Sequence, residues 1–114
     1  MKHTTEFDWL MERHVIPEHT RETLVNYLTK GWEPGGFVTA MLAMDMERAV
    51  YAADVVNGKN IQPIARWIIE YCPRASWGSY DQVEAWCKDI NGRRTQFAEQ
   101  VEKEAVWNLL KDGA

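Results

Sequence analysis

The stretch from Gly31 to Leu42 constrains the fold more than any other, because one helical pattern ends at its start and another begins inside it. Gly31 follows a segment whose apolar residues repeat with helical spacing, and glycine is the usual left-handed residue after a helix C-terminus. Pro34-Gly35-Gly36 then has the composition of a turn. A second apolar run starts at Phe37. We therefore expect a joint between two helices, with Gly36 capping the second.

Other breaks divide the rest of the chain into short segments of the same kind. Between the breaks, apolar residues recur with helical spacing, and no run alternates with the period of two that a half-buried strand shows. At 114 residues, the chain has the usual length of one domain. The sequence thus predicts an all-α fold, a compact single-domain bundle of about five to seven short helices. It comprises an N-terminal helix over 1–15, a core over 16–90 and a C-terminal helix over 93–111, with breaks at Pro17, Asn57-Gly58, Pro73 and Asn91-Gly92.

Residues 37–56 form the most apolar part of this pattern. The segment is too long and too uniformly apolar for a surface helix with a single apolar face. Either one helix is buried on two sides, or two helices meet near Ala43–Asp45. Asp45 is a good N-cap residue, so we favour the break.

Two later helices have clearer boundaries. One is expected from about Asn60 to Tyr71, with Pro63 tolerated in its first turn. The other is expected over about 80–90, because Ser79 and Gln82 have the spacing of a capping box. Its apolar face would consist of Val83, Trp86, Cys87 and Ile90.

The charge and the apolar runs exclude several classes of protein. The net charge is -4 and no basic stripe dominates, so we expect no nucleic-acid partner. No apolar run approaches the length of a transmembrane helix, and the N-terminus lacks the apolar core of a secretory signal, so we expect a cytoplasmic protein without a membrane partner. Cys72 and Cys87 do not form a Cys-x-x-Cys pair, and we interpret them as small buried apolar residues without a disulfide.

No pattern of metal or catalytic residues stands out. His14 and His19 lie five apart across the break at Pro17, which is not the spacing of a helical metal site, so we expect neither a metal nor a cofactor. Glu47 and Asp54 are seven apart and could share a helix face as an acid–base pair of a hydrolase. We favour the interpretation that they form the solvated side of the helix.

The glycine pair of the joint is a candidate ligand site. Free backbone N–H groups at a helix start suit an anion, so Gly35, Gly36 and Phe37 could contact a small anionic ligand such as a nucleotide. No Lys-Ser or Lys-Thr follows, so the stretch is not a Walker A loop. The interpretation as a simple turn is favoured.

Aromatic residues in loops are the best candidates for a partner-binding surface. Trp32, Trp77 and Tyr80 lie in or beside loops, and Arg74 is close in sequence. Aromatic rings of this kind often anchor interfaces. The alternative, which we favour slightly, is that they close the ends of the helix bundle.

The C-terminal segment has an apolar stripe of its own. Phe97, Val101, Ala105 and Leu109 recur at four-residue steps. The stripe could cover the core or form the seam of a homodimer, and it is too short to indicate a coiled coil.

A set of short motifs runs through the middle of the chain: Ile16-Pro17-Glu18-His19-Thr20, Asn26-Tyr27-Leu28, Gly31-x-x-Pro34-Gly35-Gly36-Phe37, Ala53-Asp54-x-x-Asn57, Pro73, Trp77-Gly78-Ser79 and Val83-x-x-Trp86. As a set, over residues 16–88, they resemble a family of small uncharacterised accessory proteins encoded by tailed phages and prophages. The resemblance carries no assigned activity and no catalytic residue. It implies a phage-encoded protein that is produced inside a bacterium.

Together these observations predict a noncatalytic phage accessory protein. It would bind and modulate a host protein, for example to counteract a bacterial defence system. A binder of a small anionic ligand is the alternative, and a small helical hydrolase is the least favoured.

Overall fold

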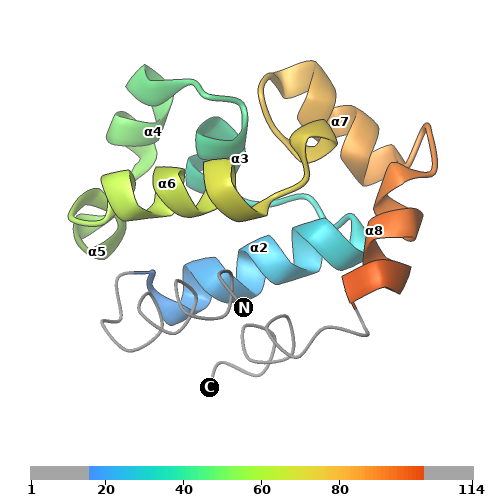
Figure 1. The fold of residues 1–114 in the computed structure, drawn as a ribbon. Coiled ribbons are helices and arrows are strands. Elements are labelled where there is room, and N and C mark those ends of the chain that lie inside the picture. The colour runs from blue at the N-terminus through green and yellow to red at the C-terminus, as the bar shows by residue number, and fades with distance from the viewer. Residues whose placement is uncertain (1–15, 102–114) are drawn as a thin grey trace.

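Helix α2 (Glu18–Lys30) lies along one side of the fold, and the other helices pack over it (Figure 1). The computed structural model describes residues 16–101, which contain seven α-helices, one short 3-10 helix and no strand. The all-α, single-domain prediction is therefore confirmed for this part of the chain. After α2 come α3 (Gly36–Leu42), α4 (Met46–Ala52), α5 (Val55–Gly58), α6 (Ile61–Tyr71), η1 (Arg74–Ser76), α7 (Tyr80–Lys88) and α8 (Arg93–Val101).

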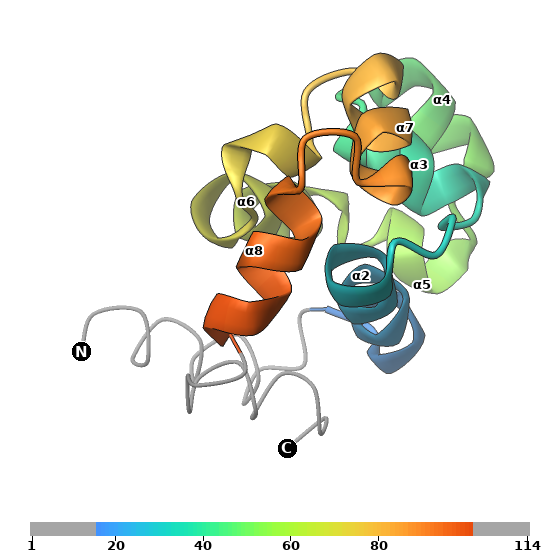
Figure 2. The ribbon, with the colours of Figure 1, turned by 90° about the vertical axis from the view of Figure 1, so that its right-hand side faces the viewer.

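The core lies where α2, α3, α6 and α7 meet. In Figure 1, α3, α6 and α7 lie above α2, and Figure 2 shows α8 against the side of the fold. Each of these four helices buries the apolar positions that its spacing brings to one face. The largest of the fully buried side chains are Trp67, Tyr27, Leu24, Leu28, Met41, Leu42, Ile64 and Ile68.

Two aromatic side chains connect the layers through hydrogen bonds. The Tyr27 hydroxyl donates to the Ser76 carbonyl at 2.7 Å, and Trp86 Nε1 donates to the Tyr27 carbonyl at 3.1 Å. Both rings lie in the core, where a polar atom without a partner would be costly. The two bonds therefore position α2, η1 and α7 relative to one another.

The joint after α2 forms as predicted. Gly31 is left-handed, with φ of 71°, and its N–H donates to the Tyr27 carbonyl at 3.1 Å. Gly35 is the N-cap of α3, whereas the sequence placed the cap at Gly36, which is the first helical residue. The difference is one position, because either glycine can adopt the extended backbone that precedes a helix.

The break between α3 and α4 is confirmed, and the chain after it forms two short helices where the sequence indicated one. Asp45 caps α4, and its side chain accepts a hydrogen bond from the Arg48 N–H at 3.2 Å. The sequence indicated a turn or a helix C-cap at Asn57-Gly58, and these two residues end the short helix α5. Asp54 accounts for that helix, because its side chain accepts from the Asn57 N–H at 2.7 Å and caps it.

Helix α7 starts as predicted and ends two residues early. The Ser79 hydroxyl accepts from the Gln82 N–H at 3.1 Å, as expected for the cap. Asp89 is left-handed, with φ of 53°, and terminates the helix after Lys88. Ile90 consequently leaves the apolar face and is 64% exposed, which corrects its assignment to that face.

Parts of the prediction lie outside the described residues. The helix expected over 1–15 is one, and the part of the C-terminal helix beyond Val101 is another. Among the helices of residues 16–101, none is long and apolar enough to cross a membrane.

Candidate functional site

A groove lies between the Gly31–Gly35 loop and α7, and we call it the joint groove. It has a volume of about 480 Å³ and is open to solvent on one side. The loop and α3 line one wall, and α7 lines the other. The lining residues are Gly31, Glu33, Pro34, Thr39, Tyr80, Asp81, Val83, Glu84, Cys87 and Lys88.

The joint groove carries a negative charge. Glu33, Asp81 and Glu84 line it with carboxylates. Lys88 is the one cation among the lining residues, and its Nζ lies 3.0 Å from Glu84 Oε2. Burial raises the pKa of the Cys87 thiol, and the carboxylates of Glu33 and Glu84 raise it further while Arg94 lowers it. The groove therefore favours a cationic ligand over an anionic one.

Tyr80 connects the joint groove to α4. Its hydroxyl donates to Asp45 Oδ2 at 2.6 Å, and its side chain is 42% exposed. This bond lowers the pKa of Asp45, and the hydrogen bond from the Arg48 N–H lowers it further. The same bond raises the pKa of Tyr80, because the carboxylate accepts the phenol proton in the hydrogen bond. The N-cap of α4 and the rim of the groove are thus one hydrogen-bonded unit.

A second surface consists of apolar side chains on α4 and α5, and we call it the α4–α5 face. Met46 and Val50 lie one turn apart on α4 and are 48% and 54% exposed. Tyr51 is the most exposed of the set at 85%, and Val55 and Val56 are exposed as well. Soluble proteins tolerate scattered exposed apolar residues, but five on two consecutive short helices make this segment a candidate interaction surface.

Little of α4 and α5 is buried. Among the described residues of α4, Ala49 alone is buried, and the side chains of α5 are all at least partly exposed. A hydrogen bond of 2.6 Å between Thr20 Oγ1 and Asn57 Oδ1 connects α5 to α2. The two helices therefore form the outer edge of the fold, at the left of Figure 1.

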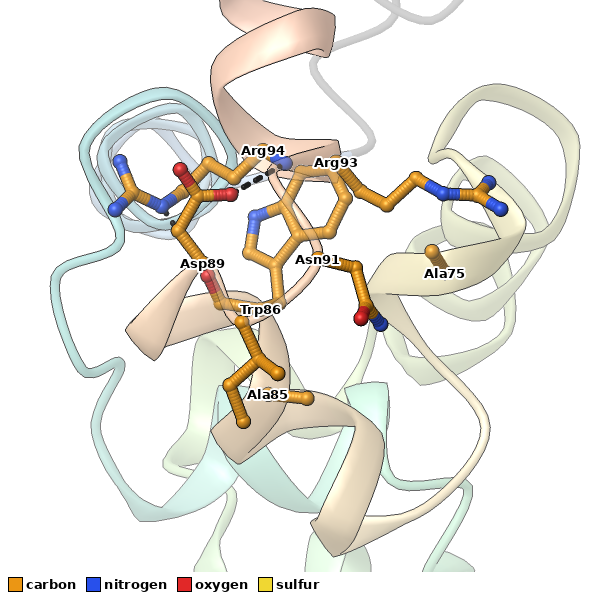
Figure 3. Close-up of a pocket in the computed structure, with 8 residues that line it drawn as sticks. Ala75, Ala85, Trp86, Asp89, Asn91, Arg93 and Arg94 are labelled. Carbon is orange, nitrogen blue, oxygen red and sulfur yellow. Dashed lines mark hydrogen bonds between the residues drawn. The ribbon is translucent and has the colours of Figure 1, made fainter.

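A third, much smaller cavity lies where α7, η1 and α8 meet (Figure 3). Its volume is about 30 Å³, enough for a water molecule and too small for a cofactor. The carboxylate of Asp89 accepts from the Arg94 N–H at 3.0 Å and from the Thr95 hydroxyl. Arg94 Nε in turn donates to the Trp86 carbonyl at 3.1 Å. These bonds give the region a structural role in joining α7 to α8.

The predicted aromatic residues have different environments. Trp32 is 57% exposed, and the Lys30 ammonium lies 4.6 Å from the centre of its ring. Trp77 is half-buried against the core and donates from Nε1 to the Cys72 carbonyl at 3.3 Å. The Arg74 guanidinium lies 4.1 Å from the Trp77 ring and donates to the Trp77 carbonyl. Trp77 and Arg74 thus support the loop between α6 and α7, whereas Trp32 faces solvent.

The predicted ligand site at the glycine pair is only partly exposed. Gly35 and Gly36 are exposed, but Phe37 is 7% exposed and belongs to the core. Its assignment as a ligand contact is corrected, because the first turn of α3 directs its ring inward. The adjacent joint groove is lined by carboxylates, which would repel an anion.

The two carboxylates considered as an acid–base pair, Glu47 and Asp54, belong to different elements. Glu47 is exposed on α4, and the Asp54 side chain is occupied in capping α5. Within residues 16–101, no three His, Cys, Asp or Glu side chains gather where they could hold a metal ion. Cys72 and Cys87 are free thiols.

The apolar stripe of the C-terminal segment begins as part of the core. The Phe97 ring is half-buried and meets the Trp86 ring edge-on, with 5.9 Å between their centres. The sequence left both a core stripe and a homodimer seam open for this residue, and the structure shows a contact with the core. The Val101 side chain, Ala105 and Leu109 lie outside the described residues.

Sequence reasoning missed both surfaces. The carboxylates of the joint groove come from a loop and from α7, and only the fold brings Glu33 to Glu84. The spacing of Asp81, Glu84 and Lys88 marks one charged face of α7 and was the available signal. The apolar excess of residues 37–56 predicts two helices that meet near Asp45, but it does not indicate which of their apolar side chains are exposed.

Comparison of the chain with protein-family models, with curated proteins and with solved structures gives no match.

Proposed function

We propose that this chain is a noncatalytic protein-binding module that docks on its partner through the α4–α5 face. The observation that carries the proposal is the exposure of Met46, Val50, Tyr51, Val55 and Val56 on one short segment at the edge of the fold. Burying apolar area stabilises a complex by about 25 cal/mol for each Å². Tyr51 supplies the kind of large amphipathic ring that anchors protein interfaces.

The partner is proposed to be a host protein in the bacterial cytoplasm. The resemblance of residues 16–88 to accessory proteins of tailed phages supports this choice. Proteins of that kind work inside the infected cell, and a component of a bacterial defence system is the partner class that fits an accessory role. The proposal requires no catalytic group.

A matched pair of substitutions tests the docking surface. Val50 on α4 and Ile69 on α6 are both 54% exposed, so Val50→Glu and Ile69→Glu introduce the same charge at equal exposure. Tagged wild-type protein and each variant are used to capture proteins from bacteria that express them. Val50→Glu is expected to reduce capture of the partner about tenfold or more, equivalent to about 1.4 kcal/mol of binding free energy. Ile69→Glu is expected to leave it unchanged.

Two results of the capture experiment would contradict the proposal. Each variant introduces its glutamate at an exposed position, so the thermal unfolding of both should resemble that of the wild type. Equal capture by Val50→Glu and Ile69→Glu would show that the partner does not contact the α4–α5 face. The absence of any specifically captured protein, together with unchanged fitness of a phage that lacks the gene, would contradict the function as a whole.

A further inference from the structure

We infer that the joint groove takes an arginine side chain from a basic segment of the partner protein. The inference rests on the proposed function, since it names the chemistry of the partner, but it concerns a different surface. The volume of about 480 Å³ is within the roughly 300–1,000 Å³ of ligand-sized pockets. Val83 and Pro34 provide apolar contact for the aliphatic part of a long side chain.

The charge of the groove selects a cation. Glu33 is on the loop wall and Glu84 is on the α7 wall, so their carboxylates approach from opposite sides. Both carboxylates raise the pKa of the Cys87 thiol, which lines the same groove. Lys88 offsets one of the three carboxylates through its ion pair with Glu84, and two negative charges remain. A basic side chain would complement them.

Arginine is favoured over other cations by the exposed ring of Trp32, which adjoins the lining residue Glu33 in sequence. Trp32 directly precedes Glu33, and its ring already has the Lys30 ammonium 4.6 Å from its centre. A guanidinium stacks on an aromatic face and can donate two parallel hydrogen bonds to a carboxylate. Glu33 lines the groove and Trp32 does not, so an arginine paired with Glu33 would displace the Lys30 ammonium in order to stack on the Trp32 ring.

The groove and the α4–α5 face can serve one partner. Tyr80 lines the groove, and its hydroxyl bonds to Asp45, which caps α4. This residue pair therefore connects the rim of the groove to the N-terminus of α4, the helix that carries Met46, Val50 and Tyr51. A partner with an apolar docking surface and a neighbouring basic segment would cover both.

The test uses a hexa-arginine peptide as the probe and two double variants that change the net charge equally. Glu33→Lys/Glu84→Lys alters the groove. Glu22→Lys/Glu70→Lys alters exposed positions on α2 and α6, and each double variant removes one exposed i,i+4 ion pair. Calorimetric titration in physiological salt is expected to show about tenfold weaker binding for the groove variant than for the control variant.

A second readout locates the peptide. Cys87 lines the groove, so bound hexa-arginine should slow its alkylation by N-ethylmaleimide, with the labelled cysteine identified by mass spectrometry. Spermidine at the same charge concentration should protect Cys87 less than the peptide. Equal weakening in both double variants, binding without protection of Cys87, or equal protection by spermidine would overturn the inference.

The result can be separated from the proposed function. Val50→Glu leaves the groove intact and should bind hexa-arginine like the wild type, even where it loses the partner. If the lysine double variant does not fold, Glu33→Gln/Glu84→Gln is compared with Glu22→Gln/Glu70→Gln. If Val50→Glu still binds the peptide and still captures the partner, the assignment of the groove is supported. The same result would show that the partner does not dock on the α4–α5 face.

Discussion

At the scale of single residues, a few positions determine how the helices are joined. Gly31 is left-handed, and a Cβ there would lie 2.6 Å from Arg94 Nε and 2.8 Å from the Cys87 carbonyl oxygen. Arg94 in turn donates to the Trp86 carbonyl and to the Thr29 carbonyl. The close approach of α2, α7 and α8 therefore depends on the absence of a side chain at Gly31.

Gly31→Ala tests this requirement. The left-handed backbone and the contact with the Cys87 carbonyl should together destabilise the fold by about 2 kcal/mol. Gly36→Ala is the matched control, because it is helical and has open space around it, and it should be stabilising by about 0.4–1 kcal/mol. Urea unfolding measures both. Equal midpoints for the two variants would contradict the geometry of the joint.

Asp89 makes the connection between α7 and α8 dependent on pH. The Thr95 hydroxyl bond is the main cause that lowers the pKa of this carboxyl below its ordinary value of 3.8, and the Arg94 and Thr95 N–H groups add to it. Since the folded pKa is below the unfolded one, the stabilisation is fully present above the unfolded pKa. It is lost as the pH falls through the folded pKa.

Thr95→Val removes the largest cause of that shift. The variant should be less stable than the wild type at neutral pH, and the difference should stay constant at pH values well above the ordinary carboxyl pKa of 3.8 and shrink as the pH falls through and below that value. Urea midpoints across these pH values provide the measurement. A difference that stays constant with pH would show that the Thr95 hydroxyl does not act through the Asp89 carboxylate.

At the scale of elements, the helices differ in how many side chains they bury. Helices α2 and α6 bury several large side chains each, whereas α4 buries Ala49 and α5 is connected through Asn57. Elements with few buried apolar contacts open at lower free energy. The α4–α5 segment therefore has few buried side chains to disturb when it adjusts to a partner.

Hydrogen exchange measures this difference directly. Amides of residues 48–52 in α4 should exchange faster than those of residues 65–69 in α6, because α4 opens without global unfolding. Asp45→Ala should speed exchange in α4 further, since removal of an N-cap costs about 1 kcal/mol. Identical protection of α4 and α6 would contradict the weak attachment of α4.

A substitution in α8 tests whether Phe97 belongs to the core or to a homodimer seam. Phe97→Ala should destabilise the fold by about 2 kcal/mol, because the half-buried ring loses its contact with Trp86. The oligomeric state measured by light scattering should not change. A variant that dissociates a dimer without loss of monomer stability would instead place Phe97 at a subunit interface.

At the scale of the whole molecule, local signals predicted the boundaries and missed the surfaces. Gly31, Asp45 and Ser79 act on the backbone beside them, so their caps are visible in sequence. The exposure of Val50 is not local, because it depends on which side of α4 meets α3. The pairing of Glu33 with Glu84 likewise requires the fold.

The central claim is that a partner protein covers the α4–α5 face, and photocrosslinking from Tyr51 tests it most directly. Tyr51 is 85% exposed and can be replaced by a photoreactive phenylalanine analogue in expressing bacteria, with Glu22 on α2 as the control position. We predict one discrete adduct with another protein from position 51, lost on Val50→Glu and absent from position 22. The same adducts from both positions, or an adduct only with a second copy of this chain, would contradict the account.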